Sequence, residues 1–550
     1  MRRPLTRGGL VGGPWLIVVG SLAVMAGLAW VLWTAAGPRK AKGQRGELVL
    51  YCAAGLLKPV SEICAAYERE YGIKVQLEPD GSGKLLSKIR LVPDRGDLFL
   101  AAEESYVRDA RKLGLVAEIL PVARQHVVLA VEPDNPHKIA GVKDLLGEKD
   151  PHGEVIRVVL PNPELAAVGK SARRALEGSG QWEALLAETR KLNARVSMVG
   201  TVTEAAQAVK IGAADATLVW DATARQFDLE TVEVPVFRSR TAEQVTLGVL
   251  AGSGDPTAAL HFARYLTARD RGQPVFQQHF LQPLDDADPW EDYPSLVLMS
   301  GAMLKPGVDD LVKEFSQREG VSINTIYAGC GIHVAQMKAM KRGEAVAGHF
   351  PDAYFSCDVS FMNMVQPWFE ASTIITRNDM VLVVPKGNPN RVRSIEDLAR
   401  PEEDPAKPTD DPAKRKLRIG LAHPVNSALG ALTDDLLKKL KLHAKVYAPG
   451  RVVLHADAGH MLVNQMRTGA LDLVVVYRSN VLSNPENAEK HLDIVEMNLA
   501  EAMAIQPYAV AKNSQHKYLM RRLLEAILSP DSQQRFRGAG FQWLAESPLP

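Results

Sequence analysis

The amino-acid sequence contains an ordered internal duplication, and this feature limits the possible folds more than any other. Three groups of segments recur in the same order. LVLY (48–51) and LKPV (57–60) recur as LVLM (296–299) and LKPGV (304–308). VVLAV (127–131) recurs as MVLVV (380–384), each followed shortly by Asn-Pro, and GAADATLVW (212–220) recurs as GALDLVVVY (469–477). Chance matches would not keep this order, so the chain carries two copies of one unit. We predict units at 47–284 and 295–550, a linker rich in Asp and Pro at 285–294, and a separate N-terminal segment at 1–46.

Each unit alternates short apolar runs with helical patterns. In the first unit, Leu48–Cys52, Lys74–Leu77 and Asp97–Ala101 are predicted strands, and Pro59–Tyr71 and Lys84–Arg90 are predicted helices. This alternation is typical of an α/β sheet covered by helices on both faces. No GxGxxG pattern follows the first strand, so a dinucleotide-binding fold is not indicated.

Composition and motifs exclude several classes of protein. The chain has 65 Lys and Arg residues against 64 Asp and Glu residues, a net charge of +1, so nucleic acid is not an expected partner. Its four cysteines contain no CxxC pair, which argues against a disulfide framework or a zinc ribbon. Because HExxH, GxSxG and P-loop patterns are also missing, the motifs indicate neither an enzyme nor a cofactor.

The N-terminal segment has the pattern of a membrane anchor. Trp15–Trp33 contains no charged residue, and basic residues flank it on both sides. At about 1.5 Å of rise per residue, a helix of this length spans a bilayer core of roughly 30 Å. We therefore predict a transmembrane helix that holds the rest of the chain outside the cytoplasm. A cleaved signal peptide is the alternative, because the small residues Thr34–Gly37 follow the apolar stretch.

Four predicted strand-to-helix turns of the first unit have a common design. They are rich in small residues: Cys52–Gly55, Gly81–Gly83, Pro161–Gly169 and Gly200–Thr203. In an open α/β sheet, ligands gather beyond the carboxyl ends of the strands, where free N–H groups at helix starts favour an anion. Ser82 adds a hydroxyl donor at the second turn. The sequence therefore predicts an anion site between these turns.

These motifs, taken in order, resemble one known family. The series CAAGL, GSG, GDLFLAA, HVVLAV, NPELAAVG and GAADATLVW is similar to the periplasmic molybdate-binding proteins, which are type II substrate-binding proteins of ABC importers. The resemblance covers Glu47–Leu284 and, less tightly, Tyr293–Leu549. It implies two tandem clamshells of two α/β lobes each, placed after the predicted N-terminal transmembrane helix. It also implies an extracytoplasmic, periplasmic solute-binding protein that closes on a molybdate-, tungstate- or sulfate-like oxyanion and presents it to an ABC permease.

The resemblance also implies ligand-binding positions in each unit. In the first unit they are Gly55, Ser82, Val168, Val202 and Trp220. In the second unit they are Ala302, Cys330, Leu429, Gly459 and Tyr477. Gly55 stands where the family usually has serine, and the loss of this hydroxyl puts molybdate itself in question. Trp220 stands where the family often has tyrosine, and its indole N–H could still donate. Asp97 and Asp352 match between the units, and the resemblance makes them structural.

Two alternative functions remain open at this point. The second unit places soft or imidazole ligands near its turns, which could hold a transition metal. These metal candidates are Cys330, His333, Cys357, His423 and His460. The same residues could instead be scattered, with Cys330 and Cys357 as free thiols or one local disulfide, and Cys52 and Cys64 as core residues. A membrane-tethered sensor or scaffold built from the same domains is the other alternative.

Overall fold

The computed structural model describes residues 46–147, 149–191, 194–238, 242–344, 348–401 and 411–546. The predicted membrane helix at Trp15–Trp33 lies outside these residues. In the parts of the chain that the structure describes, every helix is too short or too polar to cross a bilayer. The prediction of a mixed α/β fold in two tandem copies is confirmed.

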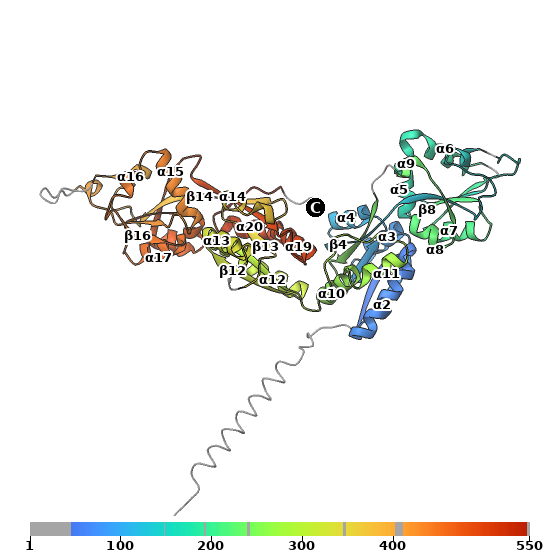
Figure 1. Ribbon diagram of the computed structural model, residues 1–550, viewed down its shortest axis with the longest axis horizontal. Helices are drawn as coiled ribbons and strands as arrows, with labels where there is room; N and C mark the ends of the chain where they lie inside the picture. Colours follow the sequence, from blue (N-terminus) through green and yellow to red (C-terminus); the bar gives the residue numbers. More distant parts are fainter. Residues whose placement is uncertain are drawn as a thin grey trace, which may run out of the picture. The chain divides into compact units, whose positions relative to one another are not determined.

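The first repeat, from β1 to α11, contains two sheets that each have helices beside them (Figure 1). Lobe one has the strand order β2-β1-β3-β10-β4, and lobe two has the order β7-β6-β8-β5-β9. The elements of lobe one are β1 Glu47–Ala53, η1 Ala54–Leu56, α2 Leu57–Tyr71, β2 Lys74–Asp80, α3 Ser82–Leu91, β3 Leu98–Ala101, α4 Glu104–Lys112, β4 Val116–Gln125, β10 Glu243–Leu250, α10 Pro256–Thr267 and α11 Gly272–Gln278. The elements of lobe two are β5 Val127–Val131, η2 Asp144–Leu146, β6 Val158–Pro161, α5 Ala167–Leu176, η3 Glu177–Ser179, α6 Gln181–Glu188, β7 Val196–Val199, α7 Val202–Lys210, β8 Ala216–Trp220, α8 Asp221–Gln226, β9 Glu230–Val232 and α9 Pro235–Arg238.

The second repeat, from β11 to β20, has the same strand order in both lobes, β12-β11-β13-β19-β14 and β16-β15-β17-β14-β18. The elements of its lobe one are β11 Ser295–Gly301, η4 Ala302–Leu304, α12 Lys305–Glu319, β12 Ser322–Ala328, α13 Cys330–Lys341, β13 Ala353–Phe355, α14 Val359–Asn363, η5 Gln366–Trp368, β14 Thr373–Pro385, β19 Met503–Val510, α19 Lys517–Ile527, α20 Pro530–Gly538 and β20 Gln542–Trp543. The elements of its lobe two are η6 Ile395–Ala399, η7 Pro412–Lys414, β15 Ile419–Ala422, α15 Ala428–Lys439, α16 His443–Val446, β16 Val452–Ala456, α17 Gly459–Arg467, β17 Leu473–Tyr477, α18 Arg478–Leu482, η8 Asn487–His491 and β18 Leu492–Glu496.

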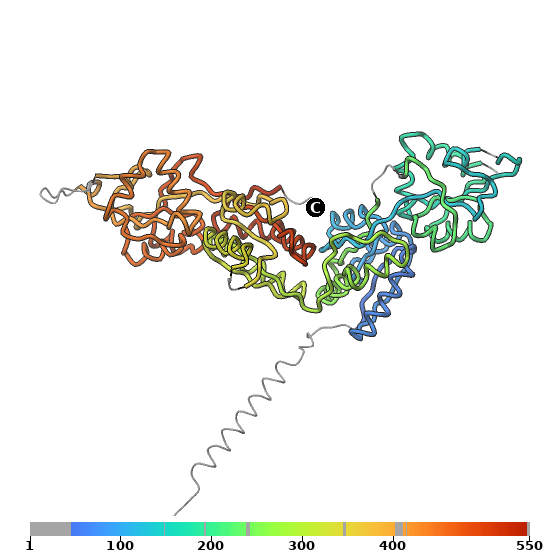
Figure 2. Tube along the Cα trace, viewed as in Figure 1, coloured from blue at the N-terminus to red at the C-terminus, as the bar shows by residue number. Residues whose placement is uncertain are grey.

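In each repeat the chain passes from lobe one to lobe two and back (Figure 2), and the repeats differ in the strands that make the first crossing. In the first repeat β4 and β5 are separate strands with His126 between them. In the second repeat one long strand, β14, pairs with β19 in lobe one and then with β17 and β18 in lobe two. In each repeat the chain returns to lobe one by the strand that follows the last strand of lobe two, β10 or β19.

The helix after the first strand shows why the local sequence folds as it does. Val60, Ile63, Cys64 and Tyr67 recur at helical spacing and are buried on one face of α2, as predicted. The helix ends at Gly72, whose φ of 68° is readily adopted only by glycine. Helix α12 of the second repeat ends in the same way at Gly320, with a φ of 65°.

One aspartate in each repeat fixes the start of the sheet in lobe one. The Asp97 carboxylate accepts from the Val49 N–H at 2.9 Å, and Asp352 accepts from the Val297 N–H at the same distance. A serine hydroxyl, from Ser253 or Ser514, donates to the other oxygen at 2.7 Å. The interpretation of both aspartates as structural is therefore confirmed.

The two repeats meet through buried charges. Glu319, at the end of α12, accepts from Arg522 Nε and Nη2 at 2.7 and 3.0 Å. Arg264 of the first repeat donates to the Glu319 carbonyl and lies 3.6 Å from its carboxylate. All three side chains are at least nine-tenths buried. Because isolated charges are costly to bury, this triad depends on the presence of each member.

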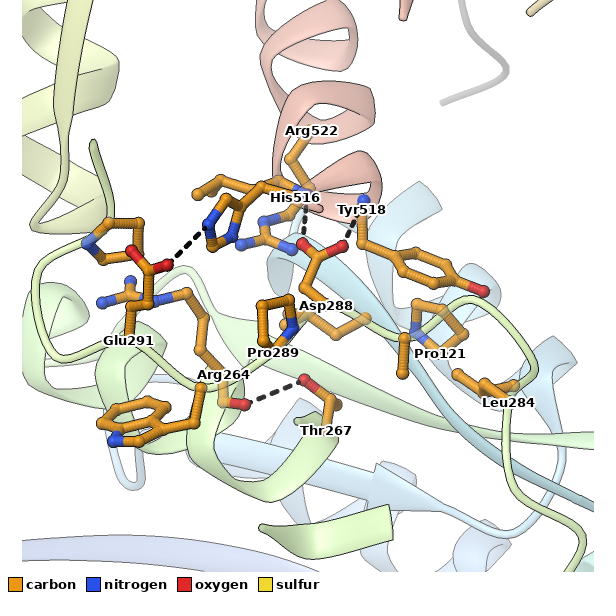
Figure 3. A pocket seen from close by; sticks show the side chains of 15 residues that line it. Pro121, Arg264, Thr267, Leu284, Asp288, Pro289, Glu291, His516, Tyr518 and Arg522 are labelled. Atoms are coloured by element: carbon orange, nitrogen blue, oxygen red, sulfur yellow. Dashed lines mark hydrogen bonds and ion pairs between the residues drawn. The ribbon is translucent and has the colours of Figure 1, made fainter. Parts of the chain in front are cut away.

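The predicted linker packs closely against the start of α19. Figure 3 shows the Asp288 carboxylate directed at that helix end, where it accepts from the N–H groups of Tyr518 and Leu519 at 3.0 Å each. Beside it, Glu291 pairs with His516 at 3.3 Å. A carboxylate at a helix start satisfies free N–H groups and opposes the positive end of the helix dipole. The segment thus stabilises the contact between the repeats.

The first prediction concerns Glu319. Glu319→Gln should lower the free energy of unfolding by about 3–5 kcal/mol, because it removes the carboxylate that pairs with the buried Arg264 and Arg522. Glu486→Gln, which removes the exposed partner of Lys490, should change it by less than about 1 kcal/mol. Urea titration of the fragment from Glu47 measures both. Equal values for the two variants would contradict the role of the triad.

The same comparison has an expected pH dependence. Burial opposes ionisation of Glu319, but Arg522 and Arg264 outweigh burial and hold the pKa of its carboxyl below the usual value. A group with a lowered folded pKa adds stability above its unfolded pKa of about 4.3 and loses that contribution as the pH falls through the folded value. The difference between wild type and Glu319→Gln should therefore shrink in acid.

Candidate functional site

The four predicted turns of the first repeat meet between its two lobes. A Cβ added at Gly55 would lie 2.9 Å from Val202 Cγ1 and 3.9 Å from Trp220 Cδ1. A Cβ at Gly81 would lie 2.8 Å from the Gly200 carbonyl oxygen and would collide with the Leu165 carbonyl. Turns from η1 and α3 in lobe one are therefore in contact with the starts of α5 and α7 in lobe two.

The first cleft is closed at this point. The Gly83 N–H donates to the Leu165 carbonyl at 2.9 Å, a backbone hydrogen bond between the two lobes. A Cβ at Gly83 would collide with the Glu164 carbonyl oxygen, so no larger residue permits this approach. The small residues of the Gly81–Gly83 turn thus allow the lobes to close.

Polar contacts from α5 also join the lobes. Lys170 Nζ donates to Ser105 Oγ at 2.6 Å, and Arg174 lies 3.7 Å from Glu103 and bonds to Glu243. The partners flank or belong to β3, α4 and β10, which form lobe one. By alignment of Val168 with Leu429, the second repeat has Ala431 and Asp435 at the positions of Lys170 and Arg174. These bridging contacts are therefore particular to the first cleft.

Ser82 begins α3 and is buried in the closed cleft. Its Oγ accepts from the Ala102 N–H at 3.2 Å, which leaves the O–H as a donor for a ligand. Val168 is the second residue of α5 and Val202 the first of α7, so their backbone N–H groups belong to helix starts. The structure brings these residues to the same cleft as Gly55.

Thr223 is a cleft residue that the sequence analysis missed. It lies buried in the short helix α8, three residues after Trp220, which is also buried. Thr223 Oγ1 would lie 3.4 Å from a Cβ at Gly55. A second hydroxyl therefore stands near the position where Gly55 lacks one. Its only sequence signal is its place one turn after the aromatic residue at the end of β8.

The second cleft is closed by equivalent contacts. A Cβ at Gly329 would collide with the Asn426 carbonyl, and one at Gly331 with the Val425 carbonyl. A Cβ at Gly459 would lie 3.1 Å from Leu429 Cδ2, so two more predicted positions are neighbours. The mouth of this cleft is a cavity of about 630 Å³ whose lining includes Ala302, His460 and Asn480. Asn480 takes the place of Thr223.

The floor of the second cleft differs chemically from that of the first. Cys330 Sγ accepts from the Cys357 N–H at 3.0 Å. In the first cleft the corresponding bond runs from the Ala102 N–H to the Ser82 hydroxyl. Within the described chain, the Tyr477 hydroxyl and Ser300 Oγ are buried without a hydrogen-bond partner. Burial, followed by the neighbouring Cys357, Asp358 and Cys330, raises the pKa of Tyr477 well above its usual value.

The five metal candidates do not converge. His333 is buried, and its Nε2 bonds to the Ser300 carbonyl at 3.0 Å. His423 Nδ1 accepts from the Val425 N–H at 3.2 Å. His460 lines the cavity at the mouth of the cleft. Among the described residues, the three potential ligands with atoms within 4.8 Å of one another are in the first repeat: His137, Asp150 and Glu154. Among the five candidates, Cys330 and Cys357 lie side by side, and the described residues do not gather all five into one ligand cluster. Turns at the ends of different strands and helices separate the imidazoles.

Comparison with known proteins gives two relatives. A protein of Haemophilus influenzae, named as a candidate binding protein, is 31% identical over 219 residues, which are 39% of this chain and 83% of the relative. The lipoprotein YvgL of Bacillus subtilis, named as a candidate ABC transporter substrate-binding protein, is 24% identical over 254 residues, which are 45% of this chain and 86% of the relative.

Solved structures are similar to part of this chain. The periplasmic molybdate-binding protein of Azotobacter vinelandii is 16% identical with a TM-score of 0.34, covering 43% of this chain and 100% of that one. Iron-bound HitA from Pseudomonas aeruginosa is 18% identical with a TM-score of 0.36, covering 44% of this chain and 90% of that one.

The sequence profile of one family matches the chain twice, at residues 48–282 and 296–542. Each match includes both lobes of one repeat and the turns that meet in its cleft. Together the two matches span most of the chain. The protein therefore belongs to the family of bacterial extracellular solute-binding proteins, and it carries two copies of the family's unit.

Proposed function

We propose that the first cleft captures a small oxyanion of the molybdate, tungstate or sulfate class and that the protein presents it to an ABC permease. The proposed binding positions are Gly55, Ser82, Val168, Val202, Trp220 and Thr223. The units are proposed at 47–284 and 295–550, joined by 285–294, with 1–46 as the membrane anchor or signal segment. The proposed ligand-binding positions of the second cleft are Ala302, Cys330, Leu429, Gly459 and Tyr477.

One observation carries this proposal: helix starts from both lobes meet at a buried serine hydroxyl. The starts of α3, α5 and α7 face one cleft, and each helix start has N–H groups without a partner inside its helix. Such groups, together with the helix dipole, favour an anion without a compensating cation. Ser82 and Thr223 supply neutral donors, so the overall charge near zero is compatible with anion binding.

Closure is the proposed mechanism of capture. A ligand that contacts both lobes shifts the equilibrium toward the closed form by the difference between its affinities for the two forms. The contacts of Lys170 and Arg174 and the Gly83 hydrogen bond exist only when the lobes meet. They therefore add to the stability of the ligand-bound state, which the permease would recognise.

A titration tests the ligand class. The fragment from Glu47 should bind at least one of molybdate, tungstate, sulfate or phosphate in isothermal titration calorimetry. Ser82→Ala should weaken binding about tenfold or more, because a hydrogen bond to a charged group contributes about 1.5–3 kcal/mol. Ser87→Ala, on the same helix with its hydroxyl bonded to the Gly83 carbonyl, should bind as wild type does. Absence of heat with all four anions would refute the proposal.

A charge variant tests the closing contacts. Arg174→Ala should weaken anion binding by a factor of about two to five, since a partly exposed ion pair contributes up to about 1 kcal/mol. Arg173→Ala is the matched control on the next residue, because Arg173 pairs with Glu164 and Glu177 inside lobe two. An equal loss of anion affinity in both variants would show that the contacts of Arg174 between the lobes do not contribute to binding.

A pair of glycine variants assigns the binding cleft. Gly83→Ala should abolish closure of the first cleft, because its Cβ collides with the Glu164 carbonyl, while alanine still favours the helix. Gly331→Ala should do the same in the second cleft through the Val425 carbonyl. We expect anion binding to be lost in Gly83→Ala and retained in Gly331→Ala, measured by the same titration. The opposite result would assign the anion to the second cleft.

A further inference from the structure

The floor of the second cleft holds two thiols where the first cleft has a hydroxyl and a methyl group. Cys330 begins α13 as Ser82 begins α3, and Cys357 follows β13 as Ala102 follows β3. The same hydrogen bond joins the two positions in both clefts. The Cys357 N–H donates to Cys330 Sγ at 3.0 Å, and the Ala102 N–H donates to Ser82 Oγ at 3.2 Å. The second cleft thus keeps the local geometry and changes the reactive atoms.

The two sulfurs lie against the same backbone atom. A Cβ added at Gly301 would collide with Cys357 Sγ and would lie 3.3 Å from Cys330 Sγ. The first repeat has Ala53 at the position of Gly301, so the second thiol and the glycine that makes room for it occur together. Both cysteines are free thiols in the closed cleft.

The environment distinguishes the two thiols. Burial opposes ionisation of Cys330, but hydrogen bonds from Cys357 and Tyr354 outweigh burial and hold the pKa of Cys330 below its usual value. The neighbouring Cys330 sulfur and burial raise the pKa of Cys357. Cys330 is therefore the better nucleophile of the pair, since the thiolate is the reactive form.

The opposite lobe covers the pair. Tyr477, at the end of β17, is buried next to both cysteines, which are themselves at most 5% exposed. Gly301 is followed by Ala302 and Met303, which line the cavity of about 630 Å³ at the mouth of the cleft. Opening of the lobes would therefore expose the thiols to a reagent in this cavity.

We propose that Cys330 and Cys357 form a thiol–disulfide exchange site whose substrate is a small-molecule disulfide. The Cys330 thiolate attacks one sulfur of the substrate and releases the other as a thiolate. Deprotonated Cys357 then attacks the Cys330 sulfur of the mixed disulfide and releases the second thiolate. The protein gains one disulfide and loses two electrons, and the substrate leaves as two thiols carrying the two protons. An extracellular location suits this chemistry, because disulfides persist in oxidising compartments.

The test uses the full chain, reduced and then freed of reductant. After incubation with oxidised glutathione, the protein is denatured in N-ethylmaleimide and its intact mass is measured. Of the four cysteines, two should be labelled and two should not, without retained glutathione, and digestion should yield peptides linked through Cys330 and Cys357. Four labelled thiols, or a link between other cysteines, would overturn the proposal.

Single variants separate the two steps. Cys357→Ser should retain one glutathione on Cys330, because the second attack cannot occur. Cys330→Ser, which restores the serine of the first cleft, should leave its three remaining thiols labelled. Cys52 and Cys64 are an internal control: both are buried in the core of the first repeat, and burial, the largest cause, raises the pKa of Cys64 to about 12. Retained glutathione in Cys330→Ser would contradict the assigned nucleophile.

A cover variant tests access, and circular dichroism confirms that each variant is folded. Tyr477→Ala should speed formation of the disulfide at least tenfold, while Tyr293→Ala, at an exposed tyrosine of the predicted linker, should keep the wild-type rate. An unchanged rate in Tyr477→Ala would refute gating by the opposite lobe. All of these measurements count thiols, so they are independent of whether the first cleft binds an anion.

Discussion

Close approach of backbone to backbone across each cleft is the constraint on which the closed structure depends. Gly81 and Gly83 in the first repeat, and Gly329 and Gly331 in the second, meet carbonyl groups of the opposite lobe at distances that leave no space for a Cβ. The glycines flank one variable residue, Ser82 or Cys330, which is thereby held at the bottom of the cleft. The glycines thus determine how closely the lobes approach, and the residue between them determines the chemistry of the cleft. The two properties can therefore diverge independently.

The two repeats show this divergence within one chain. Their strand orders agree, and the aspartates that hold the first strand make the same bonds in both. The residues that face the clefts differ: hydroxyls and cationic bridges occur in the first, and thiols and unpartnered hydroxyls in the second. The bonds of this frame lie within one lobe and are the same in both repeats, whereas the residues that face the clefts differ.

The repeats, the α/β alternation and the turns that meet could be predicted from the sequence, because periodicity and small residues are local signals. Ser82 and Cys330 were found through the resemblance of their turns. Thr223 was missed, since its approach to Gly55 depends on packing between lobes. The five metal candidates illustrate the same limit: each lies near a turn, yet His333 and His423 each use one ring nitrogen in a hydrogen bond with a backbone group. The triad of Glu319, Arg264 and Arg522 likewise joins residues far apart in sequence and had no local signal.

The uninterrupted strand β14 gives the two clamshells unequal hinges. In the first repeat the ladder is broken at His126, whose N–H bonds to the Asp221 side chain, so rotation can concentrate at a residue outside the ladder. In the second repeat the pairing passes directly from Asp379 with β19 to Met380 with β17, and opening must bend a strand that stays paired on both sides. A stiffer hinge opens less often, so the second clamshell would sample its open form on a slower timescale than the first.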